Sequence, residues 1–191
     1  MDPVTLEGPR LRLRPWRADD DAPLFAINGD ADCMRYFKAA MTRTESDAWA
    51  NRMRNHLAEH GWGFWVAEER ATGSFAGVVG LLSIPWDVIP WPVEPATPPV
   101  EIGWRIGPGH QRKGFAEEAA RLSLAYGFGR LGLPEIVAFT RPDNEASWRL
   151  MEKLGMRAAG SFDHPGMEDH PMREQLLYRL SRADWVTSRF G

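Results

Sequence analysis

Cysteine, long apolar runs and an excess of one charge are all missing from this sequence. Cys33 is the only cysteine, which excludes an intrachain disulfide and a multi-cysteine metal site, so we expect a reducing cytoplasmic setting and no metal. No apolar run reaches the length of about 18 residues that suggests a membrane span. The first residues also lack the basic and apolar regions of a signal peptide. The net charge of -3 gives no bulk attraction for nucleic acid, so we expect neither a membrane nor a nucleic-acid partner.

What is present indicates one globular domain over residues 1–191. Hydrophobic residues make up 43% and charged residues 26% of the chain, as in ordinary soluble proteins. Apolar spacing of period two alternates with helical spacing, which predicts an α/β (α+β) fold with a mixed sheet and helices on its faces. The predicted strands are 10–14, 64–69, 75–82, 100–106, 135–140, 156–163 and 173–180. The predicted helices are 19–27, 44–61, 115–131, 144–154 and a short terminal one from Ser181.

Local residues suggest where several of these elements begin and end. Asp19 is expected to cap the first helix, and Thr44–Asp47 resembles a capping box for the second. Gly155 stands where a left-handed residue would end the helix 144–154. Six prolines make residues 84–99 unsuitable for a helix or a central strand, so we expect a surface loop there. A functional loop and a simple insertion are both compatible with this pattern.

The segment from Ile106 to Glu117 combines the features of an anion site. A predicted strand ends at Ile106, a Gly-Pro-Gly-His turn follows, and a helix begins near Gly114. The first turn of a helix presents unpaired N–H groups and the positive end of the helix dipole. Gly114 lets a phosphate approach the backbone, and Arg112 and Lys113 add positive charge. Residues Gln111-Arg112-Lys113-Gly114-Phe115-Ala116 are therefore predicted to bind a pyrophosphate.

Two other phosphate motifs do not fit. A Walker loop needs Gly-Lys followed by Ser or Thr, but here Lys113 precedes Gly114. The string Gly127–Gly132 matches G-x-G-x-x-G, but it falls at the end of a predicted helix and not between a strand and a helix. We interpret it as a helix terminus.

The pattern Gln-x-x-Gly-x-Ala resembles the coenzyme A motif of the GNAT superfamily of N-acetyltransferases. Further segments, in matching order, resemble the ribosomal-protein N-acetyltransferase (RimJ/RimL-like) branch: Leu11–Trp16, Val100–Trp104, Asn144–Met156 and Leu177–Leu180. The resemblance implies a GNAT fold, with a twisted, mostly antiparallel sheet of about seven strands splayed between strands 4 and 5. It also implies transfer of an acetyl group from acetyl-CoA to a primary amine by direct attack in a ternary complex.

The same resemblance implies roles for individual residues. Trp104, Arg105 and Ile106 would line the pantetheine arm, and residues 111–117 (Gln111, Arg112, Lys113, Gly114, Phe115, Ala116 and Glu117) would hold the pyrophosphate. Asn144 would contact the pantetheine region and Ser147 the thioester or the phosphates. Plain helix capping by Asn144, and core packing by Trp104 and Ile106, are the structural alternatives.

The catalytic residues are less firmly indicated. Glu101, on the strand that leads to the predicted loop, is the leading candidate for the general base, and a purely structural carboxylate is the alternative. His164 and His170 are further candidates, whereas His110 fits a turn residue. Many GNAT enzymes have a tyrosine as general acid where this chain has Met151, which leaves Ser147 or water for that role.

The acceptor stays open at the level of sequence: a protein N-terminal α-amine or a small-molecule amine. We expect the loops 84–99 and 164–172 to select it, with Trp86 and Trp91 packing on an acceptor or on a second subunit of a homodimer. A non-catalytic acyl-CoA-binding module is the alternative from another functional class, and a thiol-release assay over an amine panel separates the two.

Overall fold

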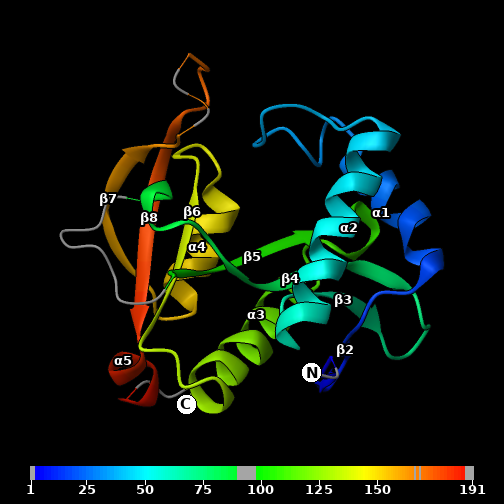
Figure 1. The fold of residues 1–191 in the computed structure, drawn as a ribbon, viewed down its shortest axis with the longest axis horizontal. Helices are drawn as coiled ribbons and strands as arrows, with labels where there is room; N and C mark the ends of the chain where they lie inside the picture. The colour runs from blue at the N-terminus through cyan, green and yellow to red at the C-terminus, as the bar shows by residue number, and fades with distance from the viewer. Residues whose placement is uncertain (1–2, 90–97, 166, 168, 188–191) are drawn as a thin grey trace. The chain divides into compact units, whose positions relative to one another are not determined.

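The structure, a computed structural model, describes residues 3–89, 98–165, 167 and 169–187 and separates into two compact units. Unit 1 comprises residues 1–82 and 103–123, and unit 2 comprises residues 83–102 and 124–191. The hydrogen-bonded strands follow the order β1-β2-β3-β4-β5-β6-β8-β7, and β5 (Val100–Ile106) contributes residues to both units (Figure 1). The sheet is mixed and mostly antiparallel, as predicted, with eight strands where about seven were expected.

The strands of unit 1 are antiparallel. They are β1 (Leu6–Glu7), β2 (Leu11–Arg14), β3 (Phe64–Glu69) and β4 (Phe75–Ser83). The two-residue β1 accounts for the strand that the sequence did not predict, since two residues are too few to show a period. The remaining strands match the predicted ranges to within one residue.

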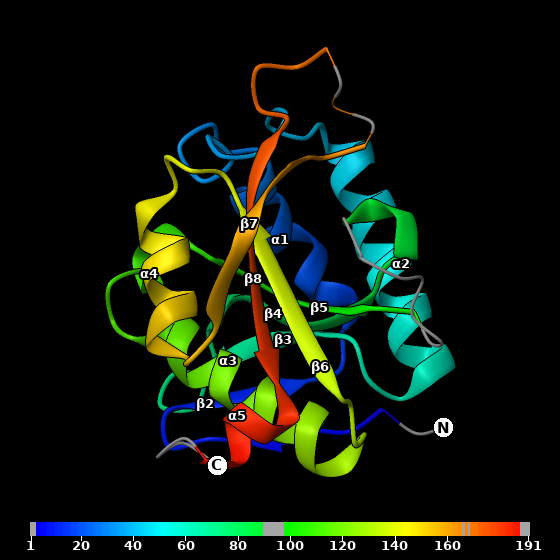
Figure 2. The same ribbon diagram turned by 90° about the vertical axis from the view of Figure 1, so that its left-hand side faces the viewer.

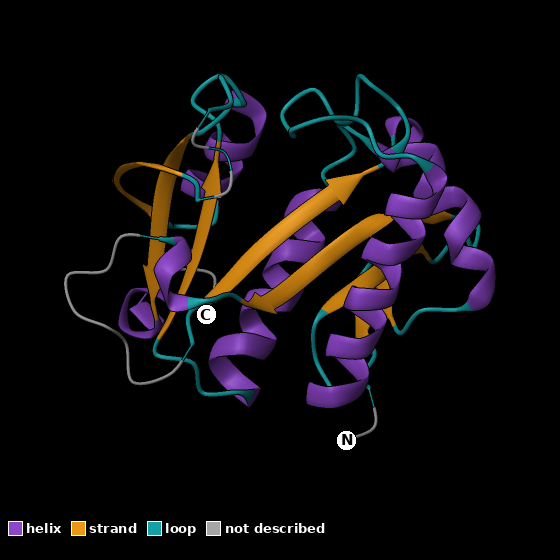
Figure 3. Cartoon of the chain, turned by 45° about the horizontal axis from the view of Figure 1, so that its top comes forward, coloured by secondary structure: helices purple, strands orange, loops and turns teal. Residues whose placement is uncertain are grey.

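Helices cover both faces of these strands. α1 (Asp21–Asn28) and α2 (Arg43–His60) pack on one face. The opposite face, which carries Leu11 and Leu13, is equally buried. Figure 2 labels α3 (Phe115–Ala125) on the side of β3 and β4 opposite to α2, and Figure 3 shows helices in purple on both sides of the strands. The core under α1 and α2 consists of Leu24, Ala50, Met53, Phe64 and Val78, with Trp16, Trp49, Phe75 and Leu82 packed against it.

The predicted helix starts in unit 1 are wrong by a few residues. A 3-10 turn (Ala18–Asp20) precedes α1, and the Asp20 carboxylate accepts the N–H of Arg17 at 2.6 Å. The capping box of α2 is formed by Thr42 and Glu45, whose carboxylate accepts the N–H of Thr42 at 2.7 Å. The sequence shows this Thr-x-x-Glu pattern two residues before the Thr-x-x-Asp that we chose.

The helix after the predicted pyrophosphate loop also differs in detail from the prediction. Its α-helical part ends at Ala125, and a π-helical segment (Tyr126–Arg130) continues it. Ala119 is fully buried as expected, whereas Ala125 is exposed. The rejected Gly127–Gly132 string begins inside the π-helical segment, so its interpretation as a helix terminus is confirmed.

Unit 2 is a smaller sheet with helices. It contains β6 (Glu135–Thr140), β8 (Glu174–Ser181) and β7 (Arg157–Asp163), with α4 (Glu145–Lys153) packed on them and α5 (Arg182–Thr187) at the end (Figure 2). β8 pairs antiparallel with both of its neighbours. Gly155 has a φ of 87° directly after α4, and the N–H of Asp184 donates to Ser181 Oγ at 3.1 Å, so both predicted helix signals are confirmed.

The two ends of the proline-rich segment, residues 84–89 and 98–99, are described. A 3-10 turn (Trp86–Val88) begins it, and the N–H of Ile84 donates to the carbonyl of Pro99 at 2.9 Å. Residues 90–97, including Trp91, lie outside the described residues. The role expected for this loop therefore stays a prediction.

Candidate active site

The predicted pyrophosphate loop has an unusual backbone. After β5, a 3-10 turn (Pro108–His110) leads to Gln111, whose side-chain amide donates to the carbonyl of Ile106 at 2.9 Å. Arg112 has a φ of 59° and is the only non-glycine residue with a positive φ among those described. Gly114 follows with a φ of 78°. Two left-handed residues so close together form a concave run of backbone that suits an anion.

The charges around this loop favour the same ligand. Arg112 and Lys113 are exposed, directly before the first turn of α3. The Glu117 carboxylate is paired with Arg121 along the helix at 2.9 Å, so its negative charge is balanced locally. Phe115 is buried and anchors the start of α3 in unit 1. The residues present therefore fit a diphosphate group.

Arg10 and Glu118 also belong to this region, although no motif or spacing in the sequence connects them. The Arg10 Nε donates to Glu118 Oε2 at 2.7 Å, and its Nη1 donates to the carbonyl of Lys113 at 2.7 Å. The two partners are 108 residues apart, and no spacing rule relates them. The alternation of Arg10, Arg12 and Arg14 with Leu11 and Leu13 indicates only a half-buried strand.

Arg105 occupies a polar and aromatic enclosure of unit 1. Its Nη1 donates to Asn28 Oδ1, and its guanidinium lies 4.5 Å from the ring centre of Phe37 and 4.9 Å from that of Trp49. Its Nε is buried without a hydrogen-bond partner. Burial lowers the pKa of Arg105 to about 10, which still leaves it charged at neutral pH. Its side chain is thus held by the α1–α2 side of unit 1, and only its backbone is available for the role predicted from the resemblance.

Trp104 and Ile106 are the other two β5 residues predicted to line the pantetheine arm. Ile106 is buried and Trp104 is half-buried. Ile106 is therefore a core residue whose carbonyl holds Gln111. Both alternatives considered for it, core packing and a backbone role, are compatible with this position.

Glu101 lies in unit 2, in the first half of β5. It is paired with Val137 of the parallel strand β6. Among the described residues, this is the only position at which these two strands are paired. Burial raises the pKa of Glu101 to about 8. None of the described residues forms an ion pair with it. A carboxyl group with a pKa near neutrality and without a fixed charge partner is suited to proton transfer.

Asn144 does not cap α4 through its side chain, although it occupies the N-cap position. Its Nδ2 instead donates to Thr140 Oγ1 at 2.9 Å. This contact fixes the amide plane and leaves Oδ1 without a partner among the described residues. The capping alternative is therefore wrong, and an oriented acceptor remains. Ser147 lies one turn into α4 and is half-buried, and its N–H donates to the carbonyl of Asn144 at 3.0 Å.

The remaining candidates for acid and base differ in their surroundings. Met151 is 2% exposed and belongs to the core of unit 2. His164 contacts the carbonyl of Pro165 at 2.6 Å, and His170 Nδ1 accepts the N–H of Met172 at 3.1 Å, so both rings are tied to their own loop. His110 lies 3.7 Å from the Glu69 carboxylate and stacks on Phe115, as expected of a turn residue.

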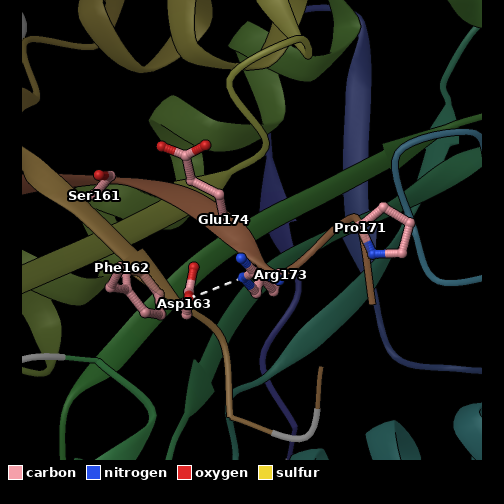
Figure 4. Close-up of a pocket in the computed structure, with 6 residues that line it drawn as sticks. All are labelled: Ser161, Phe162, Asp163, Pro171, Arg173 and Glu174. Atoms are coloured by element: carbon pink, nitrogen blue, oxygen red, sulfur yellow. Dashed lines mark hydrogen bonds and ion pairs between the residues drawn. The ribbon is translucent and has the colours of Figure 1, made fainter. Parts of the chain in front are cut away.

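A pocket lies at the β7–β8 hairpin of unit 2. Its volume is about 600 Å³. Asp163 and Arg173 form an ion pair across it at 3.0 Å, whereas the Glu174 carboxylate points away from that pair (Figure 4). The lining residues are Ser161, Phe162, Asp163, Pro171, Arg173 and Glu174. Two carboxylates and one guanidinium line the pocket, so its net charge is negative.

The described residues contain neither a candidate membrane span nor a cluster of metal ligands. None of the helices in that part of the chain is long and apolar enough to cross a membrane. No group of three or more His, Cys, Asp or Glu side chains is arranged there to hold a metal ion.

Comparisons with known proteins identify the family. Residues 10–157 match the acetyltransferase (GNAT) domain model. YkkB of Bacillus subtilis is 34% identical over 77% of this chain and 81% of its own length. The spermidine N(1)-acetyltransferase of Escherichia coli is 25% identical over 81% of this chain and 76% of its own. A structure of the Vibrio cholerae spermidine N-acetyltransferase, in complex with CoA and spermine, covers 94% of this chain and all of that one with a TM-score of 0.72 at 20% identity. This chain has the GNAT fold and belongs to the GNAT family of N-acetyltransferases.

Proposed function

We propose that this protein transfers the acetyl group of acetyl-CoA to a primary amine, with residues 111–116 binding the pyrophosphate of the donor. The left-handed pair Arg112 and Gly114, directly before α3, is the observation that carries this assignment. A non-glycine residue in the left-handed region costs about 1 kcal/mol or more, and such strain is typical of ligand-binding backbone. The amide of Gln111 supports the loop through the carbonyl of Ile106.

The chemistry requires a neutral amine and a departing thiolate. Acetyl-CoA supplies the acyl group as a thioester. A bond forms between the amine nitrogen and the acyl carbon, the carbon–sulfur bond breaks, and the amine loses one proton. We assign that proton to the Glu101 carboxylate, directly or through water, because burial brings its pKa to about 8, close to the pH at which amines begin to lose protons.

Two residues of unit 2 are proposed to serve the donor. The free Oδ1 of Asn144 can accept an N–H of the pantetheine arm, since Thr140 fixes the other end of the amide. The Ser147 hydroxyl is the proposed proton donor to the leaving thiolate, because Met151 in the usual tyrosine position has no proton to give.

For the acceptor, we propose a small amine with a second positive charge, such as a polyamine. The acidic pocket at the β7–β8 hairpin, with Glu174 lacking an ion-pair partner among the described residues, suits a cationic ligand. Relatives named for spermidine support this class. A protein N-terminal α-amine is the second candidate. It is the acceptor suggested by the resemblance of residues 11–16, 100–104, 144–156 and 177–180 to the RimJ/RimL-like branch.

A thiol-release assay with acetyl-CoA tests the proposal. The panel contains a polyamine, a monoamine of equal length and a short peptide with a free N-terminus. We expect kcat/KM for the polyamine to exceed that for the monoamine by about tenfold, the effect of roughly 1.4 kcal/mol of charge interaction. Faster turnover of the peptide would assign the acceptor to the protein class. Binding of coenzyme A without turnover of any amine would instead indicate a non-catalytic module.

A further inference from the structure

Arg10 connects the start of β2 to the predicted pyrophosphate loop within unit 1. Its Nε donates to Glu118 Oε2 and its Nη1 to the carbonyl of Lys113, both at 2.7 Å. The guanidinium also lies 5.0 Å from the ring centre of Phe115. A Cβ on Gly114 would lie 3.3 Å from Arg10 Nη2, so the guanidinium directly borders the left-handed residue.

Glu118 creates an electrostatic difficulty that this arrangement resolves. It lies in the first turn of α3, where a donor pyrophosphate would be bound, and a free carboxylate there would repel it. Glu118 Oε1 accepts the N–H groups of Arg10 at 2.7 Å and Leu11 at 2.9 Å, in addition to the Arg10 side chain. Burial alone would raise the pKa of Glu118, but these hydrogen bonds outweigh it and hold the pKa below its ordinary value. The carboxylate is therefore charged, and Arg10 neutralises it.

The second contact of Arg10 orients the loop backbone. In a trans peptide the C=O and the following N–H point in opposite directions. The Lys113 carbonyl points to Arg10, so the N–H of Gly114 points away from it and stays available to a ligand. Stacking on Phe115 fixes the plane of the guanidinium that holds this carbonyl.

We propose that Arg10 is a positioning residue for the acyl donor: it holds the Lys113–Gly114 peptide in its anion-binding orientation and shields the donor pyrophosphate from the Glu118 carboxylate. This inference rests on the proposed function of residues 111–116. It assigns to the beginning of the domain a role in donor affinity that lies outside the loop itself. The acceptor and the proton transfers do not depend on it.

The test compares two acyl donors in Arg10→Met. S-acetyl-pantetheine lacks the pyrophosphate, so a positioning role predicts a loss with acetyl-CoA alone. We expect KM for acetyl-CoA to rise at least tenfold with little change in kcat, since a charge-assisted hydrogen bond contributes about 1.5–3 kcal/mol. kcat/KM for S-acetyl-pantetheine should stay within about twofold of the wild type, the scatter expected where no contact is lost.

Arg12→Met is the matched control, because Arg12 has the same charge, lies two residues further along the chain in β2 and pairs with Glu7 at 2.7 Å. It should leave both donors unaffected. Adding Glu118→Gln to Arg10→Met should restore part of the affinity for acetyl-CoA. Arg10→Lys keeps the charge but cannot donate to Glu118 and to the Lys113 carbonyl with the same geometry, so it should give an intermediate KM for acetyl-CoA. It also tests the inference if Arg10→Met does not fold.

Each outcome decides something specific. Equal KM values for acetyl-CoA in Arg10→Met and Arg12→Met would overturn the inference, as would an equal loss with both donors, which indicates general destabilisation. A further loss on adding Glu118→Gln would refute the shielding role. If the wild-type protein does not bind coenzyme A, measured by calorimetry, the proposed function itself fails and not only this inference.

Discussion

Arg14 donates two parallel hydrogen bonds to the Asp20 carboxylate, from Nη1 to Oδ2 at 2.9 Å and from Nη2 to Oδ1 at 2.8 Å. The same guanidinium donates Nε to Glu68 at 2.5 Å, and all three side chains are less than 10% exposed. β2, the turn before α1 and β3 are thus joined by one buried ionic network. Such a network strongly penalises the removal of a single partner, because the others stay buried and charged.

Arg14→Met should therefore lower the free energy of unfolding by about 3–5 kcal/mol. Chemical denaturation at neutral pH measures this change. Arg43→Met is the control, since its pair with Asp47 is 53% and 39% exposed and is expected to contribute less than about 1 kcal/mol. Equal losses in the free energy of unfolding in the two variants would show that the buried Arg14 network stabilises the fold no more than an exposed ion pair does.

Gly114→Ala separates the cost of backbone strain from the cost to the proposed function. Gly73, in the β3–β4 turn, has a φ of 71° and open space where a Cβ would stand, so Gly73→Ala is the control for the backbone strain alone. Gly114 has a φ of 78°, and a Cβ there would in addition lie 3.3 Å from Arg10 Nη2. Both variants should lose about 1 kcal/mol of stability. Only Gly114→Ala should also raise KM for acetyl-CoA, by about tenfold if one backbone contact to phosphate is lost. A normal KM in Gly114→Ala would argue against the assignment of the loop.

Asn144→Ala should reduce donor affinity with a modest effect on stability. Its side chain does not cap α4, but the substitution removes the hydrogen bond to the buried Thr140 hydroxyl, so we expect a loss of about 1 kcal/mol. KM for acetyl-CoA should rise several-fold, by about 1 kcal/mol for a lost neutral hydrogen bond. Thermal unfolding and initial rates measure the two effects. A large loss of stability with an unchanged KM would reverse the interpretation.

Glu101→Gln should make stability less dependent on pH. The folded protein holds this proton with a pKa of about 8, and the unfolded chain with a pKa near 4.3. The stability that Glu101 contributes is therefore complete below about pH 4.3 and is lost as the pH rises to about 8. Above pH 8 the variant should be more stable than the wild type by about 2–4 kcal/mol.

The same substitution tests the proposed base. Wild-type kcat/KM should rise with pH up to about 8, and Glu101→Gln should lose that rise together with about 10²-fold or more of the rate. Glu59→Gln, at a position 75% exposed on α2, is the control for both measurements. An unchanged pH–rate profile in Glu101→Gln would assign the base elsewhere.

The sequence predicted the fold closely because its main signals are local. The strands 64–69, 100–106 and 135–140 match their predicted bounds, since each is a continuous apolar or alternating run. Helix starts were less accurate, because Thr42 and Thr44 each stand three residues before a residue able to close a capping box, and the chain uses Thr42. The two-residue β1 is too short for any periodic signal.

The site was predictable only where it is contiguous. The loop Gln111–Ala116 could be identified from six successive residues. The link from Arg10 to Glu118, and that from Arg105 to Asn28 and Trp49, join residues from distant parts of the sequence. Such pairings follow from tertiary packing, which periodicity and spacing do not encode.

β7 ends the strand order, so its outer edge has no neighbouring strand among those described. Its register slips between Ala158 and Ser161, Gly160 has a φ of 105°, and charged Arg157 and Asp163 stand at its two ends. An incoming extended chain would find no continuous ladder of N–H and C=O groups there. The bulge therefore protects the protein against edge-to-edge aggregation at high concentration.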